Sequence, residues 1–126
     1  MTQVQFAEEM LSHLQERNPR FHPRAFLLVL SALNHVIENL PRRRHISGRE
    51  LAEGVREVAL ERFGLMARTV LNHFGIRSTG DVGEVVFALV ESGVLVKQED
   101  DHLEDFQDVY DFEEVFETAY PWGARP

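Results

Sequence analysis

The sequence predicts a mainly α-helical domain of five helices with a small C-terminal β-hairpin, which is an α+β fold. Three observations lead to this prediction. Apolar residues recur at helical spacing from the N-terminus as far as Gly93. Proline and glycine interrupt this pattern and so separate the helices. Beyond Gly93 the chain changes to β-branched and aromatic residues around a polar run, which is typical of a hairpin.

The first two helices are predicted on either side of a turn that contains Pro19 and Pro23. Residues 3–18 form an amphipathic pattern, because four apolar side chains fall on one stripe of a helix: Val4, Ala7, Leu11 and Leu14. Residues 23–40 are apolar on nearly every side of the helix they predict. A helix of this kind belongs at the centre of a bundle.

Three more helices are predicted from their end signals. The third begins at a capping box formed by Ser47 and Glu50 and ends at Gly64. The fourth covers residues 65–75. The fifth begins after Ser78, whose side chain is expected to cap it, and ends just before the predicted hairpin.

The predicted hairpin pairs residues 94–98 with residues 106–112 around the polar turn EDDHLED. A last short helix is expected over residues 112–120, so residues 1–120 form one helical domain and residues 121–126 form a tail. Helix, short turn, helix and hairpin in this order resemble a winged helix-turn-helix, which indicates a winged-helix-like C-terminal half.

Charge is distributed unevenly along the chain, whose net charge is −8. Residues 1–80 carry 11 Arg and 8 acidic residues, a balance of +3, whereas residues 81–126 carry 2 basic and 13 acidic residues, a balance of −11. A uniformly acidic protein repels nucleic acid, but a polarised one need not, because only the contacting face matters.

Composition also limits the class of protein. The chain has no cysteine, which excludes disulfides, thiolate nucleophiles and zinc–thiolate sites. Its first residues are acidic where a signal peptide is basic, and its longest apolar stretch, residues 25–40, is too short and too polar to span a bilayer. We therefore expect a cytoplasmic protein that does not bind a membrane.

Three segments carry a resemblance to a known family: HISGRELAEGVREVALERFG, STGDVGEVVFALVESGVL and DFQDVYDFEEVF. With them, residues 5–117 resemble a family of short bacterial proteins of unknown function. The resemblance implies a bacterial, self-contained domain. It carries over no catalytic residue.

Motifs for catalysis or metal binding are weak in this chain. The loop GIRSTGDV has the glycine spacing of a phosphate-binding loop, but Asp81 stands where that loop has lysine. The six histidines include no HExxH pair, and no serine lies in a G-x-S-x-G motif. We therefore expect no enzyme, no cofactor and no metal site, although a small hydrolase or metal-binding protein stays as a third alternative.

A basic cluster is the first candidate site, and it surrounds the predicted start of the third helix. Free backbone N–H groups at such a start favour an anion, and arginine binds phosphate well. The loop is therefore a candidate for nucleic-acid binding, unless its arginines pair with the acidic residues of the same chain. The predicted fifth helix disfavours DNA, because its polar face is acidic. The candidate residues are Arg42, Arg43, Arg44, His45 and Arg49.

Aromatic residues among acidic ones form the second candidate site, near the C-terminus. A hairpin and a short helix are not expected to bury all of these rings, and an acidic aromatic surface suits a basic protein partner or a second copy of the chain. The leading hypothesis is therefore a non-catalytic interaction module, and the alternative is a nucleic-acid-associated protein that uses residues 42–49. The candidate partner-binding residues are Phe106, Tyr110, Phe112, Phe116 and Trp122.

Overall fold

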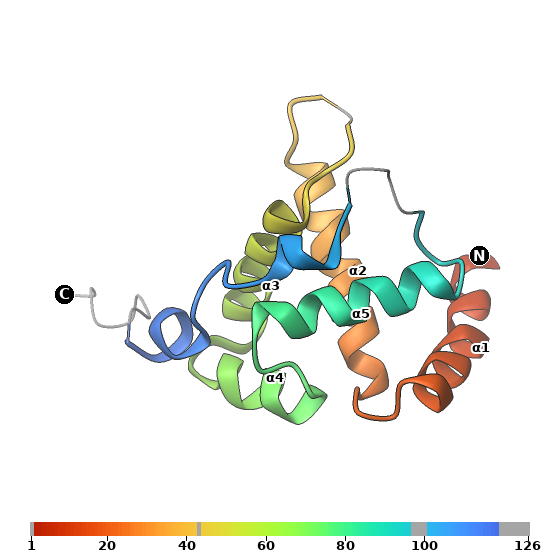
Figure 1. Ribbon diagram of the computed structural model, residues 1–126, viewed down its shortest axis with the longest axis horizontal. Helices are drawn as coiled ribbons and strands as arrows, with labels where there is room; N and C mark the ends of the chain where they lie inside the picture. Colours follow the sequence, from red (N-terminus) through yellow and green to blue (C-terminus); the bar gives the residue numbers. More distant parts are fainter. Residues whose placement is uncertain (1, 43, 97–100, 119–126) are drawn as a thin grey trace.

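The computed structural model describes residues 2–42, 44–96 and 101–118, with side chains between residues 9 and 117, and this part of the chain is all-helical (Figure 1). Its elements are α1 (Thr2–Arg17), α2 (Pro23–Glu38), α3 (Gly48–Phe63), η1 (Gly64–Met66), α4 (Ala67–Phe74), α5 (Thr79–Glu91), η2 (Leu103–Phe106) and η3 (Glu114–Thr118). The short elements η1 and η2 are 3₁₀ turns, and η3 is a π-helical turn. The five predicted α-helices are therefore confirmed.

The predicted helix ends are present as well. The backbone N–H of Glu50 donates to Ser47 Oγ at 3.1 Å, and the N–H of Ser47 donates to the Glu50 carboxylate at 2.9 Å, which is the reciprocal capping box. At the start of α5, the N–H of Asp81 donates to Ser78 Oγ at 3.2 Å. Helix α4 ends at Gly75, whose φ of +92° suits glycine. Local sequence signals thus specify where these helices begin and end.

The prediction of a β-hairpin is wrong, and with it the winged-helix resemblance. Neither residues 94–96 nor residues 101–112 contain a strand, while residues 97–98 of the predicted first strand and residues 99–100 of its turn lie outside the described residues. Residues 103–106 instead form η2, and the predicted last helix is present as a helical turn at residues 112–118. The predicted tail, residues 121–126, also lies outside the described part.

Side chains satisfy the backbone of this C-terminal segment in place of a partner strand. The N–H of His102 donates to the Asp105 carboxylate at 3.0 Å, and the N–H of Val109 donates to Thr79 Oγ1 at 3.2 Å. The N–H of Glu114 donates to the Asp111 carboxylate at 3.1 Å. Two of these bonds are local and the bond to Thr79 is long-range, and together they occupy N–H groups that a sheet ladder would otherwise use.

Helix α2 lies at the centre of the bundle, as its apolar pattern predicts, and it packs against α1, α3, α4 and α5. Its most buried residues are Ala25, Phe26, Val29 and Ala32. Gly54 of α3 faces α2 so closely that an ideal Cβ there would overlap Val36 Cγ2 and lie 3.3 Å from the carbonyl oxygen of Ala32. The missing side chain therefore allows the two helices to approach.

The C-terminal segment covers the open side of the bundle, where η2 packs against α3 and α5 and η3 packs against α4 (Figure 1). Phe106 fills a slot between two helices, since an ideal Cβ at Gly48 would lie 3.0 Å from its ring and one at Gly83 would lie 2.8 Å from it. The ring also packs edge-on against the ring of Phe87, with 6.5 Å between the two ring centroids. The slot thus fixes this segment to the helical body.

Candidate partner-binding surface

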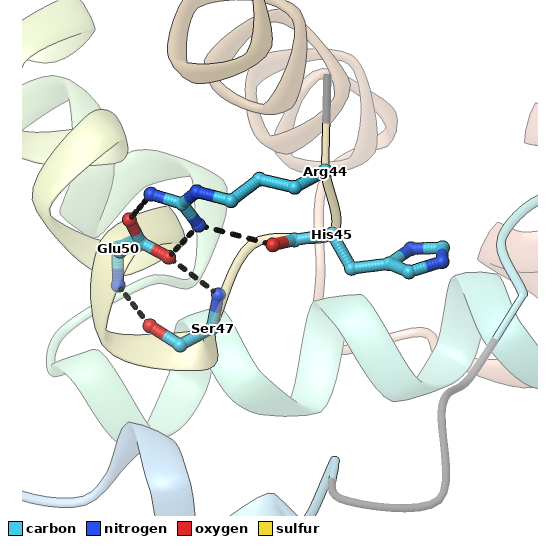
Figure 2. A network of polar contacts seen from close by, with 4 residues as sticks. All are labelled: Arg44, His45, Ser47 and Glu50. Carbon is cyan, nitrogen blue, oxygen red and sulfur yellow. Dashed lines mark hydrogen bonds and ion pairs between the residues drawn. The ribbon is translucent and has the colours of Figure 1, made fainter. Parts of the chain in front are cut away.

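The arginine loop, residues 42–49, connects α2 to α3 and uses one of its arginines internally. Arg44 reaches Glu50 with both terminal nitrogens, Nη1 to Oε1 at 3.0 Å and Nη2 to Oε2 at 2.7 Å. The same Nη1 donates to the carbonyl oxygen of His45 at 3.1 Å, while the imidazole of His45 points away from this network (Figure 2). Glu50 therefore serves both as part of the helix cap and as the counter-ion of Arg44.

This network changes the ionisation of both partners. Hydrogen bonds from the Arg44 side chain and from the backbone of Ser47 lower the pKa of Glu50 to about 2. The hydrogen bond to Glu50 in turn raises the pKa of Arg44 above its ordinary value. The charge of Arg44 is thus offset by an ionised carboxylate in direct contact, which reduces its value for binding a phosphate.

We expect Glu50→Gln to flatten the acid side of the stability profile. Because the pKa of Glu50 is lower in the folded chain than its ordinary 4.5, the unfolded chain takes up this proton first as the pH falls. The stabilisation is therefore complete above about pH 4.5 and is lost as the pH falls toward 2. Urea midpoints measured across this pH range should fall modestly less in the variant than in the unaltered protein, since the pair is partly exposed and screened.

Glu61→Gln is the matched control for that measurement. Glu61 lies exposed on the same helix and forms no hydrogen bond or ion pair with the rest of the described chain. Its variant should keep the full acid dependence. An equal flattening in both variants would show that the effect follows net charge and not the Arg44–Glu50 contact.

The rest of the arginine loop stays exposed. In residues 2–42, 44–96 and 101–118, no hydrogen bond or ion pair joins the side chains of Arg42, His45 or Arg49 to another residue, and Arg43 lies outside the described residues. Sequence reasoning left open whether the loop pairs with the acidic C-terminal residues. Within the described part, Arg44 pairs with Glu50 of α3 and not with a C-terminal carboxylate.

Three of the predicted partner-binding rings lie in the core and not on the surface. Phe106, Phe112 and Phe116 are 3%, 4% and 2% exposed, so the prediction that they form a partner surface is wrong for these three rings. The rings of Phe112 and Phe116 pack edge to face with 5.0 Å between their centroids, and the ring of Tyr110 stacks on that of Phe112 with 5.8 Å between centroids. Trp122 lies outside the described residues. Gaps between helices, which single-sequence patterns do not display, accommodate the phenylalanines.

Tyr110 ties the same segment to α3. Its hydroxyl donates to the carbonyl oxygen of Ala52 at 2.7 Å, and the guanidinium of Arg56 lies 5.9 Å from its ring centre. Burial, with a smaller contribution from Glu53, raises the pKa of the Tyr110 hydroxyl above its ordinary value. The hydroxyl therefore acts as a fixed hydrogen-bond donor.

What the buried rings leave on the surface is the acidic segment, residues 101–117. It contains eight acidic residues and no lysine or arginine. Arg68 of α4 contacts it, at 2.6 Å from the Glu117 carboxylate and 3.9 Å from that of Glu113. The exposed carboxylates are those of Glu104, Asp105, Asp108, Asp111, Glu113, Glu114 and Glu117. The segment therefore presents a dense negative surface.

A cavity of about 270 Å³ lies between the arginine loop and the start of the acidic segment, and its walls are mainly apolar. Arg44 and His45 border it from the loop, and Asp101 and Asp105 border it from the acidic segment. Sequence reasoning missed this cavity, because its α2 residues, Leu33 and Ile37, belong to the apolar face that predicts the core. The apolar wall includes Leu33, Ile37, Val86, Val90, Leu95 and Val96.

Comparisons with known proteins identify no relative: no family model, no curated protein and no solved structure matches the chain. The resemblance to short bacterial proteins of unknown function therefore stays a prediction. None of the helices in the described part of the chain is long and apolar enough to cross a membrane. Within that same part, no group of three or more His, Asp or Glu side chains is placed to hold a metal ion.

Proposed function

We propose that the protein is a cytoplasmic, non-catalytic interaction module that recognises a basic protein partner through its acidic segment. One observation carries this proposal: the segment turns its aromatic rings inward and its carboxylates outward. An exposed array of one charge attracts a surface of the opposite charge and speeds their encounter. The aromatic residues anchor the acidic segment to the helices and do not contact the partner themselves.

The carboxylates of the acidic segment are ordered before any partner binds. Phe106 in its glycine slot, the hydrogen bond from Tyr110 to Ala52 and the cap at Asp111 fix the backbone at three points. A segment that is already ordered loses little conformational freedom on binding. This preorganisation favours recognition of the partner by a fixed pattern of charges. A flexible acidic tail would attract the partner without such a pattern.

The acidic segment also suits recognition better than catalysis. General acid–base chemistry with two carboxylates requires environments that separate their protonation behaviour. Here the carboxylates of Glu104, Asp108 and Glu114 are exposed to solvent alike, and no hydrogen bond or ion pair within the described residues involves them. We therefore propose charge recognition as their role.

A charge-neutral variant tests this function. We expect Glu104→Gln/Asp108→Asn/Glu114→Gln to bind a peptide of alternating lysine and serine about tenfold more weakly at low salt, because three exposed charges contribute about 0.5 kcal/mol each. Raising the salt concentration should weaken binding by the unaltered protein. Isothermal titration calorimetry measures both effects.

The control has the same net charge but leaves the acidic segment intact. Glu9→Gln/Glu16→Gln/Glu61→Gln removes three exposed carboxylates from α1 and α3. This variant should bind the peptide nearly as well as the unaltered protein. Equal weakening in the two triple variants would refute the proposal, because binding would then depend on net charge alone.

A further inference from the structure

Arg68 of α4 binds the acidic segment from within the same chain. Its Nη1 donates to Glu117 Oε1 at 2.6 Å and lies 3.9 Å from Glu113 Oε2. One guanidinium therefore contacts two carboxylates of the surface that the proposed function assigns to a basic partner. Arg68 stands where a cation of the partner would bind.

Helix α4 is held to the core, while the ion pairs of Arg68 lie at the surface. Ala67 and Leu71, which flank Arg68 on this helix, are fully buried. The Arg68 side chain is 33% exposed, and those of Glu113 and Glu117 are 71% and 50% exposed. Ion pairs this exposed contribute little to stability, so the exchange of one cation for another costs little free energy.

A cavity with mainly polar walls gives a second cation access to the same place. It has a volume of about 440 Å³ and lies between the start of α5 and the acidic segment. Arg68 and Glu113 line this cavity together with Asp108, Asp111 and Arg77, so three carboxylates face two arginines. A lysine side chain that enters the cavity meets Asp108 and Asp111, and it reaches Glu113 at the longer of the two Arg68 contacts.

We propose that Arg68 is an internal competitor of the basic partner, and that a cationic side chain of the partner replaces it at Glu113 and Glu117. This inference rests on the proposed function, since it concerns regulation of the same surface. A partner with a single cation only takes the place of Arg68. A partner with several neighbouring cations also contacts the rest of the acidic segment, so the competitor selects against weakly basic surfaces.

Nuclear magnetic resonance tests the exchange directly on the unaltered protein. The Arg68 Nε–Hε signal is identified by its absence from the spectrum of Arg68→Gln. In the Glu113→Gln/Glu117→Gln variant this signal shows the position of a released Arg68. Saturation with the lysine–serine peptide should move the signal of the unaltered protein to that position, because the peptide then holds both carboxylates.

Affinity gives a second, independent test. Arg68→Gln should bind the lysine–serine peptide about two- to threefold more tightly at low salt than Arg77→Gln, because only Arg68 contacts the carboxylates. Arg77→Gln is the matched control: it removes the same charge from the same cavity, and no hydrogen bond or ion pair joins the Arg77 side chain to another described residue. Isothermal titration calorimetry measures both affinities, with circular dichroism to show that each variant is folded.

An Arg68 signal that stays in place at saturating peptide would overturn the inference. So would an Arg68→Gln variant that binds the peptide no more tightly than Arg77→Gln, since the effect would then follow local charge alone. If the unaltered protein still binds the peptide through the acidic segment in either case, only the competition is wrong. If the unaltered protein does not bind the peptide, the proposed function fails as well.

Discussion

Replacing Phe106 with alanine is expected to lower the free energy of unfolding by about 3–5 kcal/mol, the usual cost of removing a buried phenylalanine ring. The ring is 3% exposed and fills a slot whose walls are Gly48 and Gly83. Two glycines supply no side chains that could move into the space left behind. The substitution therefore leaves a cavity as well as losing apolar burial. Urea denaturation followed by circular dichroism measures the change.

Leu103→Ala is the matched control for the Phe106 variant. Leu103 lies in the same η2 turn but is 38% exposed, so its truncation should cost about 1 kcal/mol or less. A loss in the free energy of unfolding below about 1 kcal/mol for Phe106→Ala would contradict the burial of this ring between Gly48 and Gly83. It would mean that η2 does not pack on the helical body in solution.

Gly54→Ala should lower the free energy of unfolding by about 1–3 kcal/mol, the usual cost of overpacking a core. On an exposed helix face the same change would be favourable by about 1 kcal/mol, because alanine is the better helix former. Here the new methyl group would overlap Val36 Cγ2 and press on the carbonyl oxygen of Ala32 at 3.3 Å. The backbone of α2 would have to move away from α3. Thermal or urea unfolding of the variant measures the loss.

A second substitution separates this clash from other effects of the alanine. Val36→Ala removes the overlapping methyl group, so the Gly54→Ala/Val36→Ala double variant should be more stable than the sum of the single losses by about 0.5–3 kcal/mol. Gly80→Ala is the control, because the nearest neighbour of its Cβ would be the flexible side-chain amide of Gln107, at 3.1 Å. Strictly additive losses at positions 36 and 54 would contradict the close approach of α2 and α3.

The helices were predictable from sequence because their signals are local. Ser47, Glu50 and Ser78 lie within a few residues of the N–H groups that they cap, and α2 shows its central position in its own apolar pattern. The hairpin prediction is wrong because alternating aromatic and polar residues are typical of a β-strand but also of an irregular segment whose aromatic rings pack into a helical core. Thr79, which accepts from the N–H of Val109, is 30 positions away in the sequence. Such a partner has no local signature.

For the candidate site, the positions of the charged residues along the chain were predictable. Which of them are free to contact a partner was not. The excess of carboxylates near the C-terminus follows directly from composition. That Phe112 and Phe116 are core residues depends on gaps between helices. That Arg44 is occupied depends on a reach of six positions to Glu50, across the turn that starts α3. Both outcomes depend on three-dimensional packing, which the order of residues does not display.

The slot for Phe106 has a consequence for how the chain matures during synthesis. Helices α3 and α5 leave the ribosome before the ring that fills the slot between them. Until that ring arrives, the nascent bundle exposes an apolar notch formed around Gly48 and Gly83. The core is therefore complete only when the stretch of polypeptide that bears the outward carboxylates has been synthesised.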